Sequence, residues 1–261
     1  MPALLAALAG GTVTAFTAKT LDEGQTRDVF VRTNHAGEPV SLSEGTGVAV
    51  SCATTALLVR DDPALLAACA AGALGALDDH REDTSAKGLK GHLQALSRGQ
   101  LTTGGAKLLG ISAAALVAAT MIARERDGGA HVVDIATDAA LIAGGANLMN
   151  LFDLRPGRAL KVGALLTALG SHRRSHAAGL AGAIAAALPG DLKGRTMLGD
   201  TGANALGASI GALLARLPSR SARLALAASF VGLILASEKV SFSAVIDANP
   251  ALSAIDMWGR S

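Results

Sequence analysis

Residues 135–158, IATDAALIAGGANLMNLFDLRPGR, show the pattern that decides the fold: an apolar run of helix length ends in a short polar gap. Half of the 261 residues are hydrophobic, only 17% are charged, and the mean hydropathy is +0.41. These values lie outside the profile of an ordinary soluble domain. Because apolar runs and polar gaps alternate along the whole chain, the sequence predicts an all-α membrane protein with several transmembrane helices.

Nine apolar segments are candidate transmembrane helices. They run over residues 3–17, 45–59, 63–77, 107–123, 135–151, 160–170, 177–188, 202–217 and 224–236. Several are shorter than the ~20 residues that cross a bilayer, so we expect neighbouring polar residues to extend them. The first segment lacks the basic residues that precede the apolar run of a signal peptide, which favours a transmembrane helix. With no linker apparent, we expect residues 1–261 to form a single membrane domain.

The distribution of positive charge predicts the orientation of these helices. If the N-terminus is outside, one side of the membrane carries residues 18–44, 78–106, 152–159, 189–201 and 237–261. That side holds fifteen of the 23 Lys and Arg residues, with Lys107 and Lys161 at the helix edges included. The positive-inside rule makes it cytoplasmic, which predicts a multi-pass protein of the cell membrane, embedded in the lipid bilayer.

Other features exclude some classes of function. The net charge is only +2 and 2% of the residues are aromatic, so we expect no nucleic-acid partner. Cys52 and Cys69 lie in apolar stretches without a CxxC spacing, and we expect small buried side chains. His172 and His176 in SHRRSH have a zinc-like spacing, but neither a third ligand nor a helix is evident. A surface loop outside the membrane is the favoured interpretation.

Four aspartates lie in polar gaps on the predicted cytoplasmic side: Asp78 and Asp79 in GALDDHRED, Asp153 in NLMNLFD and Asp200 in MLGDTGANALG. Carboxylates at a membrane edge are costly and usually functional. Two adjacent acids at a helix C-terminus oppose the helix dipole and call for a cation, a proton or a phosphate-bound metal. Asp200 fits either a helix N-cap or a magnesium ligand.

Basic residues follow the Asp78–Asp79 pair in KGLKGHLQALSRGQLTTGGAK. Among glycines and hydroxyl side chains, this segment carries Lys87, Lys90, Arg98 and Lys107. One interpretation is ordinary positive-inside charge. The other is a phosphate cradle, because lysine supplies a point charge and glycine lets the backbone approach closely.

The fifth apolar segment ends in a second polar group. Asn147, Asn150 and Asp153 are three residues apart, so they share one helix face, where polar groups are expensive as packing alone. Arg155 and Arg158 follow around a Pro-Gly turn, which can present guanidinium groups to phosphate.

The order GxxDD, basic segment, NxxNLxD and MxGDTGxxxLG resembles the polyprenyl-phosphate N-acetylhexosamine-1-phosphate transferases, the superfamily of phospho-N-acetylmuramoyl-pentapeptide transferase and glycosyltransferase family 4. The resemblance spans the third to eighth apolar segments, about half of the chain. It implies Mg²⁺-dependent transfer of a sugar-1-phosphate from a UDP-sugar to a polyprenyl phosphate, with release of UMP, in cell-envelope glycan synthesis. A homodimer is compatible with it.

The resemblance also implies roles for individual residues. Asp78 would act as base or orienter for the lipid phosphate, Asp79 would lie beside the phosphates, and Asp200 would be the catalytic magnesium ligand. The residues expected to bind substrate are Lys87, Lys90, Asn147, Asn150, Asp153, Arg155 and Arg158.

Three departures from the family leave an alternative open. Pro156 stands where the family commonly has a second acid, no histidine follows His176, and the C-terminal segment lacks a tenth apolar run. The alternative is a catalytically altered homologue that binds polyprenyl phosphate or scaffolds envelope assembly. A transporter is less favoured, because transporter carboxylates lie near the bilayer midplane rather than at helix ends.

Overall fold

The computed structural model describes residues 1–24, 27–33, 37–80, 98, 102–126, 129 and 131–260. The chain is 79% helical, and the described residues form eleven α-helices, one short 3-10 helix and one antiparallel hairpin. The strands of the hairpin are β1 (Val31–Thr33) and β2 (Pro39–Ser41). The predicted all-α class is confirmed.

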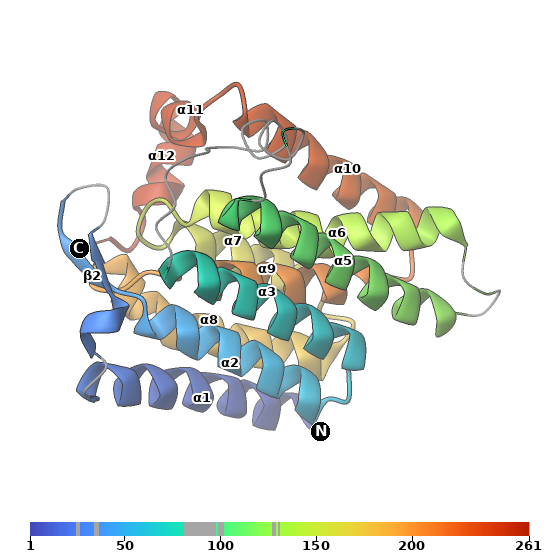
Figure 1. Cartoon of the computed structure of the whole chain (residues 1–261), viewed down its shortest axis with the longest axis horizontal. Coiled ribbons are helices and arrows are strands. Elements are labelled where there is room, and N and C mark those ends of the chain that lie inside the picture. The colour runs from blue at the N-terminus through green and yellow to red at the C-terminus, as the bar shows by residue number, and fades with distance from the viewer. Residues whose placement is uncertain are drawn as a thin grey trace.

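Each of the nine predicted apolar segments overlaps one long helix. These helices are α1 (Ala3–Glu23), α2 (Ser43–Leu58), α3 (Asp62–His80), α5 (Thr103–Arg124), α6 (Val132–Phe152), α7 (Arg158–Leu169), α8 (Arg174–Leu192), α9 (Gly199–Ala215) and α10 (Arg220–Ser237). Figure 1 shows them side by side, with β2, α11, α12 and the C-terminus together at one end. The short helices α11 (Phe242–Ala248) and α12 (Pro250–Met257) were not predicted.

Four of the described helices, α1, α5, α6 and α10, are long and apolar enough to cross a membrane. Between 17% and 56% of the most apolar window of each is buried inside the protein, so much of their apolar surface faces outward. Outward-facing apolar surface on helices of this length is what a bilayer covers. By helix length and composition, the chain is a membrane protein.

Helix α9 forms the centre of the bundle. Every residue of α9 except Asp200 is buried, and the helix packs against α2, α3 and α6. The approach is close because small residues face each other: a Cβ atom on Gly207 would collide with the carbonyl oxygen of Gly145 in α6. Small residues are the usual means of close packing between membrane helices.

The two cysteines differ in their surroundings. Cys52 in α2 is buried as expected, whereas Cys69 in α3 is exposed, and neither forms a disulfide. The expectation for Cys69 was wrong because Ala67, Ala68 and Ala71 form the inward face of α3. An apolar neighbourhood in the sequence of a helix therefore does not decide which side chains face the protein interior.

Candidate functional site

Asp78, Lys107 and Asp200 meet at the end of the bundle that carries the hairpin. Lys107 Nζ lies 2.5 Å from Asp78 Oδ2 and 2.7 Å from Asp200 Oδ2. The three side chains come from the last turn of α3, the beginning of α5 and the first turn of α9. All three are largely buried, with 15–22% of each side chain exposed. A single ammonium group thus lies between two carboxyl groups that come from separate helices.

Asp79 has a different role from its neighbour. Its carboxylate accepts hydrogen bonds from the backbone N–H groups of Asp200 and Thr201, both at 2.9 Å, and from Thr201 Oγ1 at 2.6 Å. Leu198, the residue at the N-cap position of α9, supplies no side-chain cap. Asp79 therefore caps α9 from the neighbouring helix α3.

This capping leaves the Asp200 side chain free for Lys107. The N-cap interpretation of Asp200 is wrong, because Asp200 lies inside the first turn of α9, after Gly199. Gly199 has φ +59°, a left-handed conformation that favours glycine. A Cβ atom there would also lie 3.2 Å from the Asp79 carboxylate. The GDT sequence is thus suited to this tight start of the helix.

Asp153, at the end of α6, also contacts the N-terminus of α9. It follows the last residue of α6, is 6% exposed, and accepts a hydrogen bond of 2.8 Å from the Gly199 N–H group. Burial, and next the negative charge of Asp191, raise the pKa of the Asp153 carboxyl well above its usual range. Asp153 and Asp79 together satisfy the first three N–H groups of α9.

A cavity of about 710 Å³ lies beside Asp153. Arg155, Asp191, Thr196 and Ser243 also line it, and its volume falls within the range of small-molecule sites. Asp191 was not predicted as a site residue. It is 3% exposed, and its Oδ1 accepts a hydrogen bond of 3.2 Å from the Gly157 N–H group. No motif in the sequence signals this contact, because Asp191 and Gly157 are 34 residues apart in the chain.

The other predicted substrate residues take different places. Asn147 and Asn150 are half-buried in the last two turns of α6, before Asp153. Lys87 and Lys90 lie outside the described residues.

Arg32 was not predicted: its guanidinium donates to the carbonyl oxygen of Asp79, at 2.6 Å from one terminal nitrogen. The hairpin thus contacts the end of α3 directly.

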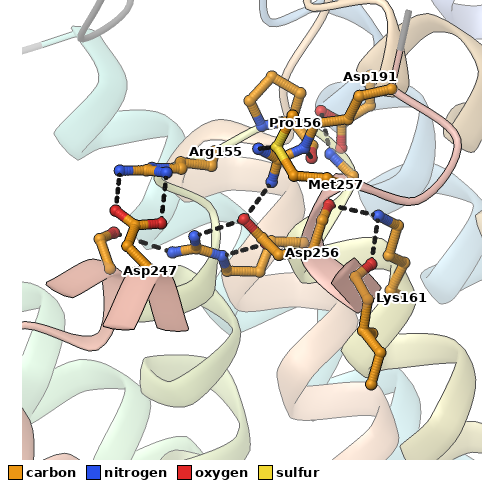
Figure 2. Close-up of polar contacts among 12 residues, drawn as sticks. Arg155, Pro156, Lys161, Asp191, Asp247, Asp256 and Met257 are labelled. Carbon is orange, nitrogen blue, oxygen red and sulfur yellow. Dashed lines mark hydrogen bonds and ion pairs between the residues drawn. The ribbon is translucent and has the colours of Figure 1, made fainter. Parts of the chain in front are cut away.

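Arg155 and Arg158 bind the C-terminal segment. Figure 2 shows Arg155 against Asp247 of α11, with two hydrogen bonds of 2.9 and 3.0 Å. Arg158 is 3% exposed and makes two hydrogen bonds, of 2.7 and 2.9 Å, with Asp256 of α12. Lys161 Nζ also donates to the Asp256 carbonyl oxygen at 2.7 Å. The basic groups predicted to face phosphate are therefore neutralised here by acids of the chain itself.

Acid should release the C-terminal helices. Burial raises the pKa of Asp256, but the hydrogen bond and charge of Arg158, and then Arg260, outweigh it and hold the pKa below its usual range. Because the unfolded pKa is the higher one, about 3.9, the carboxylate stabilises docking above that pH and loses this effect as pH falls through the folded pKa. We expect the fluorescence anisotropy of Trp258, the single tryptophan, to fall below about pH 4.

The variant Asp256→Asn is the control for this transition, because it removes the titrating group. Its anisotropy should be low already at neutral pH. Helix content from circular dichroism, recorded in parallel, separates local release from general unfolding. An anisotropy that stays constant from pH 6 to pH 2 in the unchanged chain would show that Asp256 does not hold the segment in place.

The SHRRSH segment lies at the other end of the bundle. His172 is exposed, but His176 is 2% exposed and lies in the first turn of α8, with Nδ1 3.2 Å from Asp61 Oδ2. The predicted surface loop is therefore wrong for His176, because α8 begins at Arg174, three residues before the predicted segment. The described residues contain no group of three or more His, Cys, Asp or Glu residues that could hold a metal ion.

No protein-family model matches the chain, and no curated protein matches it either. The fold and the site together define an all-α membrane protein with a cluster of two carboxylates and a lysine, and with a cavity beside Asp153. Both lie at one end of the helix bundle.

Proposed function

We propose that the chain is a Mg²⁺-dependent transferase that moves a sugar-1-phosphate from a UDP-sugar to a polyprenyl phosphate at the cytoplasmic face of the cell membrane. The products are a polyprenyl-diphospho-sugar and UMP. One observation supports this most: Asp78 and Asp200, which belong to two separate motifs, lie within 2.7 Å of a single Lys107 ammonium group. The proposal includes nine spanning helices with the N-terminus outside.

The residues at this cluster fit a magnesium ion. The described part of the chain offers no set of three carboxylate, histidine or cysteine ligands. Magnesium does not need one, because it usually keeps several waters and takes one or two carboxylates together with substrate phosphates. Asp200 and Asp78 would hold it, since their oxygens already reach one common cation. Bound there, magnesium would neutralise phosphate charge.

The proposed reaction is an exchange of one P–O bond for another. An oxygen of the polyprenyl phosphate forms a bond to the β-phosphorus of the UDP-sugar. The bond from that phosphorus to the α–β bridging oxygen breaks, and its electron pair leaves with UMP. No net proton is taken up or released when the lipid phosphate is a dianion. The chain therefore has to position and neutralise two anions, which is most of what phosphoryl transfer requires.

The described residues divide this task. Lys107 supplies a point charge next to Asp78 and Asp200, where the phosphates would meet. The cavity beside Asp153 would hold the donor, and Asp153 binds the Gly199 N–H group, which adjoins Asp200 in the chain. Donor cavity and carboxylate cluster are thus connected through the start of α9.

A second candidate function has its own support. Lys107 occupies the position between the two carboxylates, and Arg155 and Arg158 are neutralised by Asp247 and Asp256. A homologue that binds polyprenyl phosphate without turning it over, for example as a scaffold in envelope assembly, would be compatible with these pairs.

An activity assay separates the two candidates. Purified protein in detergent receives magnesium, polyprenyl phosphate and a panel of UDP-sugars, and released UMP is measured. We expect UMP from at least one donor, a return to background with EDTA, and recovery when magnesium is added back in excess. No UMP from any donor, together with intact binding of polyprenyl phosphate, would replace the transferase with the second candidate.

A further inference from the structure

The opposite end of the bundle carries another cavity, of about 640 Å³, which the proposed reaction does not use. Its polar lining comes from the turn between α2 and α3 and from the start of α8. These residues are Arg60, His172, Arg173, Arg174, Ser175 and His176. Measured along α3 from Asp62 to Asp78, this cavity is roughly 24 Å from the carboxylate cluster, at 1.5 Å per residue.

This cavity has an excess of positive charge. Three arginines line it, and all three are exposed. The carboxylate that approaches one of them, Asp61, is 1% exposed and pairs with Arg216 at 2.9 Å. Burial raises the pKa of Asp61, but His176 and Arg216 lower it more, so the carboxyl remains ionised. Arg216 pairs with Glu125 as well, at 2.5 Å. Among the residues that the structure describes, only Arg173 of the three cavity arginines has an ion pair, at 4.0 Å from Asp61.

One buried hydrogen-bonding atom at this cavity lacks a partner within the described residues. His176 is 2% exposed, and while its Nδ1 faces Asp61, its Nε2 makes no hydrogen bond. A buried polar atom without a partner costs free energy, so it points to a ligand. Helix α8 also begins here without a side-chain cap. Uncapped N–H groups at a helix N-terminus attract anions.

Arg60 occupies an unusual backbone position beside the cavity. Its φ is +56°, and the end of α2 has the two hydrogen bonds of a Schellman turn, from Asp61 N to Ala56 O at 2.9 Å and from Arg60 N to Leu57 O at 3.1 Å. Glycine is the residue that such a turn favours. The turn itself therefore gives no reason for an arginine.

We propose that this cavity binds a phosphate group, at the end of the bundle opposite the carboxylate cluster. Arginine guanidinium groups match phosphate oxygens with paired hydrogen bonds, and the α8 N-terminus adds backbone donors. His176 Nε2 adds a further hydrogen-bonding group, which donates to a phosphate oxygen when it carries a proton and accepts from a protonated phosphate oxygen when it does not. The phosphate belongs either to a free anion or to a lipid headgroup, and both sources present the same oxygens.

Binding to the full chain distinguishes the sources. Inorganic phosphate is titrated by calorimetry into protein held in phosphatidylcholine nanodiscs, and phosphatidic acid is offered in detergent and detected by native mass spectrometry. We expect Arg60→Gly and Arg174→Ala each to weaken binding about tenfold or more, as for the loss of one charge-assisted hydrogen bond. Arg60→Gly should keep or raise the melting temperature, because glycine suits the turn.

Arg124→Ala serves as the matched control, since Arg124 is an exposed arginine at the same end of the bundle, outside this cavity. Binding of inorganic phosphate that depends on Arg60 and Arg174 identifies a free anion. Binding of phosphatidic acid alone, with the same dependence, identifies a lipid headgroup. The proposal is overturned if neither probe binds, or if Arg124→Ala weakens binding as much as the two cavity variants do.

Discussion

Asp200→Asn should release UMP roughly 10²–10³-fold more slowly than the unchanged chain, an effect of the size seen when one oxyanion-hole donor is removed from an acyl-transfer site. The amide keeps the size of the side chain but loses the negative oxygen that lies 2.7 Å from Lys107 Nζ. It would also lose the charge that we propose for magnesium binding. The measurement is UMP release with the donor found in the assay described above.

Folding of this variant should be retained, because Asp79 and Asp153, not Asp200, satisfy the N–H groups at the start of α9. Equal melting temperatures in detergent would confirm this. Asp28→Asn is the matched control, since Asp28 is an exposed acid in the segment leading to the hairpin. Near-normal turnover by Asp200→Asn would remove Asp200 from the proposed metal site.

Gly207→Ala should lower the free energy of unfolding by about 1–3 kcal/mol, the usual cost of adding volume to a packed interior. The added methyl group would meet the carbonyl oxygen of Gly145, which is backbone and cannot rotate away, so α6 and α9 would have to separate. Thermal unfolding in detergent, followed by circular dichroism, measures the change.

Gly232→Ala in α10 is the control for the same chemical change. A Cβ atom there meets nothing within 4 Å, so alanine should raise helix stability by about 0.5–1 kcal/mol or leave it unaltered. If both variants have the same melting temperature as the unchanged chain, the close contact of α6 and α9 is not important for stability.

The long helices were predictable because each needs an apolar run, and runs such as 135–151 are visible without knowledge of tertiary contacts. Counting these helices along the chain also predicted that Asp78 and Asp200 lie at the same end of the bundle. In the structure, Lys107 contacts both of them there. The hairpin and α11 escaped prediction because strands of three residues and a helix of seven are too short for a periodic pattern.

The contacts between the residues of the site were harder to predict than the residues themselves. The capping of α9 by Asp79 depends on how closely α3 approaches Gly199, which no spacing in the sequence encodes. Arg158 resembles a phosphate ligand in sequence, but Asp256, nearly a hundred residues later, takes its guanidinium group. Pairs of opposite charge far apart in the chain leave no local signal.

The central position of α9 also bears on how the chain assembles during synthesis. The helices α2, α3 and α6 precede α9 in the chain, so they leave the ribosome before the partner that they share. Until residues up to Ala215 have been made, the faces of these helices that pack on α9 lack that partner. The bundle can therefore close only late in translation. Asp79 and Asp153 then meet their N–H groups in the same step, when α9 packs against α3 and α6.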